Sequence, residues 1–178
     1  MRIALLLGFC FFLIGAFEKN ALIIDQTEII VKGKTSIGRF ECSYESQGKR
    51  DTLFFDPMST EVNSLDFEIP VSAFSCGNFL LNSDFKKTLK AEKYPICLVS
   101  VNKLRRGSRK IYGDIYLQMA GQDLVLEKII FHELNDRLQG TLYLSMEELG
   151  LDASSRLGGL VKVKEAIDLE INLYLEDS

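Results

Sequence analysis

The sequence predicts an all-β protein built mostly from antiparallel strands, with one short helix inserted among them. Apolar and polar residues alternate with a period of two in several segments, which is typical of strands with one buried face. Turn-forming residues separate these segments at hairpin spacing. One stretch instead has its apolar residues at helical spacing. Together these patterns favour a β-sandwich or a β-barrel.

The C-terminal segment shows the alternation most clearly. Its apolar residues are Ile167, Leu169, Ile171, Leu173 and Leu175, with mostly polar residues between them. The same pattern predicts strands at 111–119, 138–144, 38–45 and 65–69. Weaker patterns predict strands at 28–32, 49–55, 96–102 and 124–132. The predicted turns are Asp56-Pro57, Arg106-Gly107-Ser108, Gly121-Gln122 and Asn135-Asp136.

The predicted helix begins near Leu81 and continues for about three turns, as far as Leu89. Asn82 and Ser83 are both suitable N-caps, and lysines gather toward the far end, where they complement the helix dipole. Pro95 prevents the helix from continuing. A helix inserted among antiparallel strands covers either one open end of a barrel or the edge of a sandwich.

The N-terminus has the pattern of a secretory signal peptide at residues 1–16. A basic residue precedes an apolar run from Leu5 to Ile14, and small residues follow as far as Ala16. A membrane-spanning helix needs about 20 apolar residues, more than this run supplies. An uncleaved N-terminal anchor is the alternative. Cleavage after Ala16 leaves residues 17–178 as one domain, located in the periplasm or secreted.

Charge and cysteine content narrow the range of partners. The chain has 21 basic and 25 acidic residues and no long basic stretch, which argues against nucleic acid as a partner. Cys42, Cys76 and Cys97 follow the signal peptide and match no metal site of the C-x-x-C type. In an oxidising compartment we expect one disulfide and one unpaired cysteine. We favour Cys42 with Cys76, and the pairings with Cys97 stay open. The unpaired thiol is either buried or reactive.

Residues that carry enzymatic chemistry are sparse. His132 is the only histidine, so the sequence excludes a catalytic triad and a histidine-rich metal site. Glu147 and Glu148 follow a serine at capping-box spacing, which predicts a helical turn rather than an acid–base pair. We therefore expect a protein that is not an enzyme and that uses no metal or cofactor. An ionisable side chain turned into the interior, such as Glu170 or Asp114, would indicate the opposite.

The densest basic cluster consists of Lys103, Arg105, Arg106, Arg109 and Lys110, around the hairpin tip Gly107-Ser108. It is either a solvated turn or a surface attracted to an anionic membrane. Gly158-Gly159 lacks the strand and helix that flank a phosphate loop, so we interpret it as flexible backbone.

Several motifs, taken in order, are similar to those of one protein family. Ser36-Ile37-Gly38-Arg39-Phe40 matches a Gly-x-Phe pattern, and Leu53-Phe54-Phe55-Asp56-Pro57 matches a strand that ends in Asp-Pro. The most specific piece runs from Ile69-Pro70-Val71-Ser72-Ala73-Phe74 through Asn82-Ser83-Asp84-Phe85 to Glu92-Lys93-Tyr94-Pro95. Segments 111–121 and 140–150 add a strand with a glycine-containing turn and a late strand with a helical turn. Over roughly residues 25–175 the chain resembles the YceI-like family of exported bacterial proteins.

The resemblance implies an antiparallel lipocalin-like β-barrel of about eight strands, a size that holds one small or slender ligand. It implies that the ligand is a long-chain apolar lipid of the polyprenyl or isoprenoid quinone type, and it supports the Cys42–Cys76 disulfide. Periodicity places twelve candidate ligand-binding residues inside: Phe40, Phe67, Ile69, Phe85, Leu89, Val99, Ile115, Leu117, Leu142, Leu144, Ile171 and Leu173.

We therefore expect an exported protein that carries, stores or sequesters such a lipid. The alternative is a structural or interaction barrel that is filled by its own side chains and has no small-molecule ligand. A continuous apolar cavity inside the barrel would distinguish the two. Transient contact with a membrane surface and formation of a homodimer remain open.

Overall fold

The computed structural model describes residues 21–36, 38–46, 48, 50–54, 64–107, 110–151 and 163–176. These ranges contain β1 (Ala21–Thr35), β2 (Arg39–Glu45), β3 (Asp51–Phe54), β4 (Leu65–Pro70), a 3₁₀ turn (Val71–Ala73), α1 (Phe79–Thr88), β5 (Ile96–Arg106), β6 (Lys110–Met119), β7 (Gln122–Glu133), β8 (Arg137–Ser145) and β9 (Val163–Leu175). The predicted signal peptide, the Asp56-Pro57 turn and Gly158-Gly159 lie outside the described residues.

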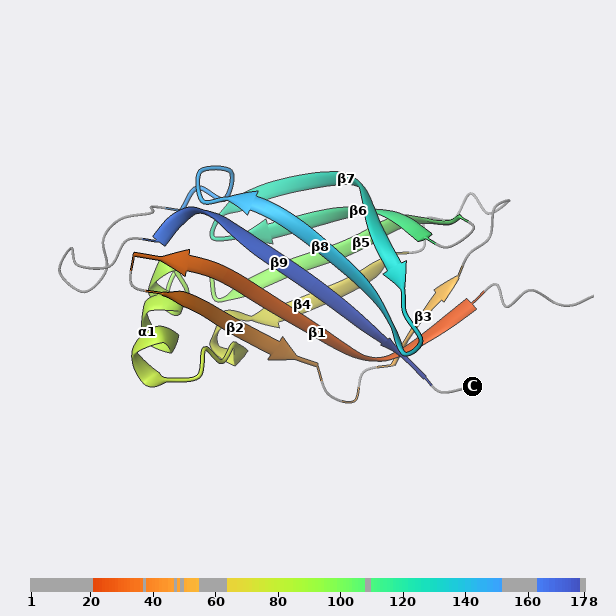
Figure 1. The fold of residues 1–178 in the computed structure, drawn as a ribbon, viewed down its shortest axis with the longest axis horizontal. Helices are drawn as coiled ribbons and strands as arrows, with labels where there is room; N and C mark the ends of the chain where they lie inside the picture. The colour runs from red at the N-terminus through yellow and green to blue at the C-terminus, as the bar shows by residue number, and fades with distance from the viewer. Residues whose placement is uncertain are drawn as a thin grey trace, which may run out of the picture.

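All the described strands belong to one antiparallel sheet. Its order is β2-β1-β9-β8-β7-β6-β5-β4, and the short β3 also pairs with β1. The strand β1 is long enough to pair with two short strands in succession. Its first residues pair with β3 and its later residues pair with β2. The sheet curls strongly into a half-barrel, with α1 at the left-hand end in Figure 1. The predicted fold class, mostly antiparallel β with one helix, is therefore confirmed.

The strand predictions are confirmed, with one marked difference in length. Alternation predicted the first strand at 28–32, whereas β1 extends over Ala21–Thr35. Its N-terminal part pairs with β3 on one side, and most of the strand pairs with β9 on the other. These residues are thus held by main-chain hydrogen bonds from neighbouring strands, a constraint that side-chain alternation does not report.

The predicted helix N-cap is wrong. The helix begins at Phe79, and the Asn78 side chain accepts the hydrogen bond from the Leu81 N–H at 2.9 Å. Asn82, one of the two predicted caps, instead accepts a hydrogen bond from the Cys76 N–H at 2.6 Å. Because Asn78 meets the same chemical requirement, the cap lies four residues before Asn82, and the helix starts at Phe79 rather than near Leu81. Its ten residues agree with the predicted length of about three turns.

The two edges of the sheet are β2 and β4. In the described part of the chain, a short bridge pairs β2 with the segment that follows β4. Ser43 on β2 exchanges two main-chain hydrogen bonds with Ser75, both 2.9 Å long. The predicted Cys42–Cys76 disulfide is present directly beside this bridge. The segment after β4 therefore connects the edges, and the disulfide makes the connection covalent.

The inner face of the sheet carries the hydrophobic core. In β4, for example, Leu65, Phe67 and Ile69 are buried while Asp66 and Glu68 are exposed. The half of the barrel away from α1 is filled by fully buried side chains: Ile111, Ile115, Phe131, Leu138, Ile171 and Leu173. The Phe131 ring packs onto Gly140 on the neighbouring strand, where a Cβ atom would come within 2.8 Å of it. That glycine is needed for the close packing.

Candidate ligand-binding pocket

An apolar pocket of about 110 Å³ lies inside the curled sheet at its α1 end. Its strand residues come from the ends of β1, β4, β6 and β8 and from the starts of β2, β5 and β9, all of which meet at this end. The lining residues are Ile29, Val31, Thr35, Phe40, Cys42, Ile69, Phe74, Leu81, Asp84, Phe85, Thr88, Leu89, Cys97, Val99, Leu117, Met119, Leu144, Met146, Leu151, Ile167 and Leu169.

The helix α1 forms one wall of this pocket. Residues Leu81, Phe85 and Thr88 share one side of the helix and all line the cavity. The Phe85 ring packs against Phe74, with ring centroids 5.1 Å apart. None of the ten helix residues is fully buried, and Leu81 is 37% exposed. The pocket therefore reaches the surface beside the N-terminal half of α1.

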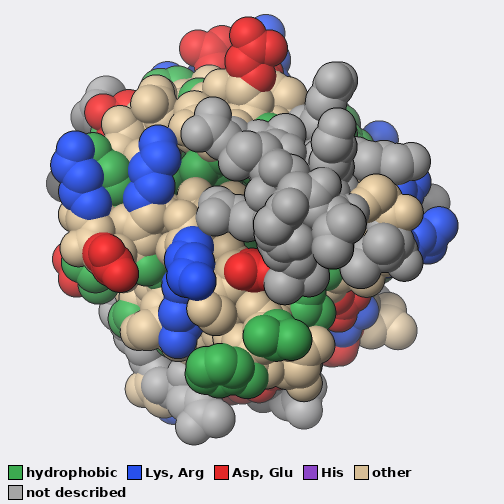
Figure 2. Space-filling view, turned by 90° about the vertical axis from the view of Figure 1, so that its left-hand side faces the viewer, with side chains coloured by type: hydrophobic (Ala, Val, Ile, Leu, Met, Phe, Trp, Pro, Cys, Tyr) green, Lys and Arg blue, Asp and Glu red, His purple; other side chains and the backbone are tan. Residues whose placement is uncertain are grey.

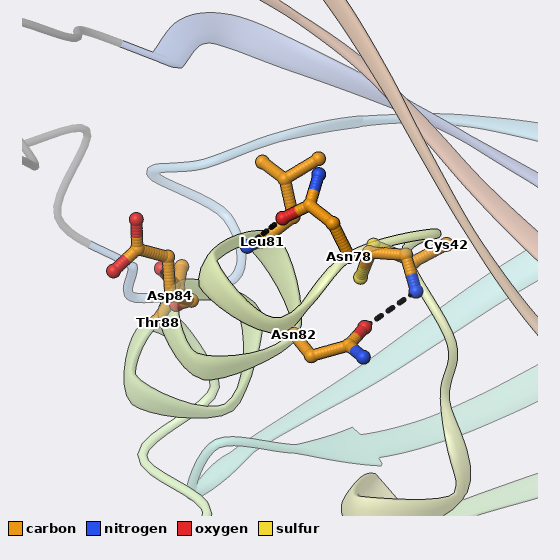
Figure 3. The surroundings of a disulfide bond; sticks show 7 residues. Cys42, Asn78, Leu81, Asn82, Asp84 and Thr88 are labelled. Carbon is orange, nitrogen blue, oxygen red and sulfur yellow. Dashed lines mark hydrogen bonds between the residues drawn. A yellow bond between two sulfur atoms is a disulfide. The ribbon is translucent and has the colours of Figure 1, made fainter.

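The disulfide holds the start of this wall in place (Figure 3). Cys42 lies on β2 and lines the pocket itself, and Cys76 lies two residues before the helix cap Asn78. The hydrogen bond from the Cys76 N–H to the Asn82 side chain ties the same point to the first turn of α1. One covalent and one polar contact thus position the helix against the edge strand.

Few polar groups face the pocket. The Thr88 hydroxyl donates to the Asp84 carbonyl oxygen at 2.8 Å, so its proton is used within the helix. The Cys97 thiol is buried, and burial raises its pKa to about 11, which keeps it protonated and a poor nucleophile at neutral pH. Asp84 is the one carboxylate among the described lining residues. This environment suits an apolar ligand.

Seven of the twelve predicted ligand-binding residues line this pocket: Phe40, Ile69, Phe85, Leu89, Val99, Leu117 and Leu144. The other five, Phe67, Ile115, Leu142, Ile171 and Leu173, are buried in the core but do not border the cavity. Whether any of the twelve contacts a ligand stays a prediction.

Sequence reasoning missed several lining residues. Met146 and Leu151 belong to the turn that follows β8, where alternation no longer reports which way a side chain points. Met119 carried a usable signal, because it is in phase with Leu117 in the alternating segment 111–119. Ile167 and Leu169 carried a usable signal, because both belong to the alternating C-terminal segment. Their position at the start of β9, beside the helix, is what brings them to the pocket.

The other residues considered for chemistry do not line the pocket. His132 is exposed near the end of β7. The Ser145 hydroxyl and N–H both bind the Glu148 carboxylate at 2.8 Å, and the Glu148 N–H donates back to the hydroxyl at 3.1 Å, as predicted for a capping box. The hydrogen bonds from Ser145 lower the pKa of Glu148. These contacts cap the turn after β8.

The two ionisable residues named as signs of an enzyme do not face the pocket. Burial opposes ionisation of Glu170, but hydrogen bonds from Lys32, Asn172 and Gln139 outweigh it and lower its pKa. A hydrogen bond from the Lys128 N–H and the nearby Lys103 ammonium lower the pKa of Asp114. Both carboxylates belong to polar networks that do not include a pocket-lining residue.

The described ranges contain no group of three or more His, Cys, Asp or Glu side chains arranged to hold a metal ion. Searching the same ranges finds no helix with the length and apolar character needed to cross a bilayer.

Comparison with known proteins identifies the fold. The sequence matches no protein-family model and no curated protein. A solved structure described as a polyisoprenoid binding domain from Saccharophagus degradans, implicated in plant cell wall breakdown, matches with a TM-score of 0.60 and 13% identity. The match covers 89% of this chain and 99% of that one. Two mutant forms of the Campylobacter jejuni YceI protein, one with a monobromobimane guest, match with TM-scores of 0.50 and 0.52. Each is 19% identical and covers 70% of this chain and 78% of that one. The expected resemblance is therefore confirmed in three dimensions, and the chain has a YceI-like fold.

Proposed function

We propose that the protein binds the apolar part of a polyisoprenoid-type lipid in the pocket beneath α1. The observation that carries the proposal is an apolar cavity inside the curled sheet beside α1. A structurally similar protein is described as a polyisoprenoid binding domain, which supports the same ligand class here.

The size of the pocket sets how such a ligand enters. A cavity of about 150 Å³ lined by apolar side chains holds one benzene molecule. The pocket of about 110 Å³ therefore accommodates the end of a prenyl chain rather than its full length. A longer chain requires an outward displacement of α1, the wall in which no residue is fully buried. Each additional 100 Å² of ligand surface removed from water contributes about 2.5 kcal/mol toward that displacement.

The mouth of the pocket gives the ligand an orientation. Leu81 and Asp84 line the side that reaches the surface, whereas the deeper lining residues Val99 and Leu117 are buried and apolar. The tail of the lipid therefore lies inward and its polar end lies near Asp84. A hydroxyl head group can donate a hydrogen bond to that carboxylate, whereas a phosphate would be repelled by it.

The proposed location is the periplasm or the extracellular space. A disulfide that joins two sheet edges persists in an oxidising compartment and is rare in the cytosol. The signal-peptide pattern at 1–16 predicts the same destination.

The proposal is tested by mass spectrometry of organic extracts from natively purified protein and from two variants at one position. Cys97→Phe places a large apolar side chain in the cavity, and Cys97→Ala enlarges the cavity at the same site. We expect a prenyl-type lipid with the wild-type protein and with Cys97→Ala, and at least tenfold less with Cys97→Phe. Far-ultraviolet circular dichroism and thermal unfolding verify that both variants fold, since overpacking costs about 1–3 kcal/mol.

The alternative, a barrel whose surface binds a partner, has its own supporting observation in the filled half of the interior around Phe131 and Leu138. The same extracts decide between the two functions. Absence of lipid from the wild-type protein and from both variants would favour the interaction barrel.

A further inference from the structure

We propose that the outer face of α1, formed by Phe79, Leu80, Ser83, Lys86 and Lys87, docks on an anionic lipid bilayer. At 100° per residue these five residues fall on one side of the helix. The opposite side, with Leu81, Phe85 and Thr88, lines the pocket. The helix therefore carries large apolar residues on both sides, along the side that lines the pocket and at the start of the side that faces solvent.

The two apolar side chains on this face are exposed to solvent rather than packed against the core. Phe79 is 82% exposed and Leu80 is 62% exposed, and the partly exposed Leu81 follows them. Isolated exposed apolar residues are common, but consecutive ones at the mouth of an apolar pocket form a patch. Figure 2 looks onto this end of the molecule and shows exposed hydrophobic side chains with basic side chains nearby.

The charge of the segment matches a bilayer with anionic headgroups. Residues 79–93 contain four lysines and two carboxylates, a net charge of +2 in a chain whose net charge is −4. Lys90 donates to the Gly150 carbonyl oxygen at 3.1 Å, and the Lys93 ammonium lies 5.1 Å from the centroid of the Tyr94 ring. Lys86 and Lys87 form no ion pair within the described residues. Long lysine side chains beside inserted apolar groups are the pattern of helices that lie at a membrane interface.

The other basic cluster, at the β5–β6 hairpin, is less suited to this role. Lys103 pairs with Asp114 at 3.0 Å, and Arg106 pairs with Glu133 at 2.8 Å, so their charges are partly neutralised. This hairpin also lies at the end of the sheet away from α1. Docking through α1 instead brings the pocket mouth to the bilayer surface. The docking surface does not depend on which ligand the pocket holds.

The test is flotation of the purified protein with vesicles of phosphatidylcholine alone and of an equal mixture of phosphatidylcholine and phosphatidylglycerol. The N-terminus is sequenced first, because a retained apolar leader would bind vesicles by itself. We compare the wild type with Phe79→Gln/Leu80→Gln and with Lys86→Gln/Lys87→Gln. Matched controls are Val125→Gln/Tyr143→Gln, which removes equally exposed apolar residues elsewhere, and Arg105→Gln, which removes a basic charge from the hairpin.

We expect the wild type to bind the anionic vesicles and to bind pure phosphatidylcholine much more weakly. Each lysine near an anionic surface contributes about 1 kcal/mol, so removal of two weakens binding about 30-fold. Removal of the apolar pair weakens binding by more than about tenfold, and both controls retain wild-type binding. The proposal is overturned by no binding to anionic vesicles, by equal loss in the controls, or by a dimer that only Phe79→Gln/Leu80→Gln dissociates. The lipid extraction described above is independent of all these outcomes.

Discussion

The Cys42–Cys76 disulfide holds the segment that follows β4 against β2. The bond closes a loop with a sequence separation of 34 residues. On the chain-entropy model, a loop of that length lowers the free energy of the folded state relative to the unfolded chain by about 4 kcal/mol. Replacing both cysteines with alanine should remove this contribution. For a domain of this size the melting temperature should then fall by about 8–15 °C.

Urea unfolding of the oxidised wild type and of Cys42→Ala/Cys76→Ala measures the effect. Cys97→Ala is the control, because it removes a buried cysteine that forms no disulfide. Reduction of the wild type should reproduce the behaviour of the double variant, and bound ligand should dissociate faster from both because the start of α1 is released. A stability difference below about 1 kcal/mol would refute this reasoning. It would mean that the Ser43–Ser75 hydrogen bonds keep this segment on β2 without the covalent bond.

Two further predictions concern residues of the pocket end. A Cβ atom at Gly33 would lie 2.4 Å from the Phe40 ring, so Gly33→Ala should displace that ring, destabilise the fold by about 1–3 kcal/mol and weaken ligand binding. In urea unfolding Gly38→Ala, which meets no atom within 4 Å, should be neutral, and equal effects would contradict the prediction. Burial raises the pKa of the Cys97 thiol from 9.0 to about 11, so the folded state favours the protonated thiol. The contribution of the buried, protonated thiol to the free energy of unfolding is complete below pH 9 and is lost as the pH rises toward 11. Between these values wild type should lose roughly 2–3 kcal/mol relative to Cys97→Ala, and parallel stability curves would argue against burial of the thiol.

The strands were predictable because a sheet with one buried face requires apolar and polar residues to alternate along each strand. The segment 167–171 is an example, since the buried Ile167, Leu169 and Ile171 alternate with Asp168 and Glu170, which are not buried. The start of the helix was not predictable, because Asn78, Asn82 and Ser83 all satisfy the chemistry of an N-cap. In the structure Asn82 accepts the hydrogen bond from the Cys76 N–H, beside the disulfide, and Asn78 caps the helix.

The position of the pocket was only partly predictable for a related reason. Alternation assigns a residue to the inner face but does not report its distance along the barrel. Ile115 and Leu117 lie on the same face of β6, yet Leu117 borders the cavity and Ile115 is packed in the filled half. That difference arises from which elements lie opposite, namely α1 and the turn after β8 for the cavity, and the far ends of the strands for the filled half.

The way α1 is anchored restricts the shape of ligand that the pocket admits. Its start is held by the disulfide at Cys76 and its end by Leu89, which is only 4% exposed. Between these points no residue is fully buried, so the middle of the helix can move outward at lower cost than either end. A helix fixed at both ends opens a narrow gap rather than a wide mouth. This geometry favours a slender, flexible apolar chain over a broad rigid ligand, and the filled half of the barrel limits how far that chain extends inward.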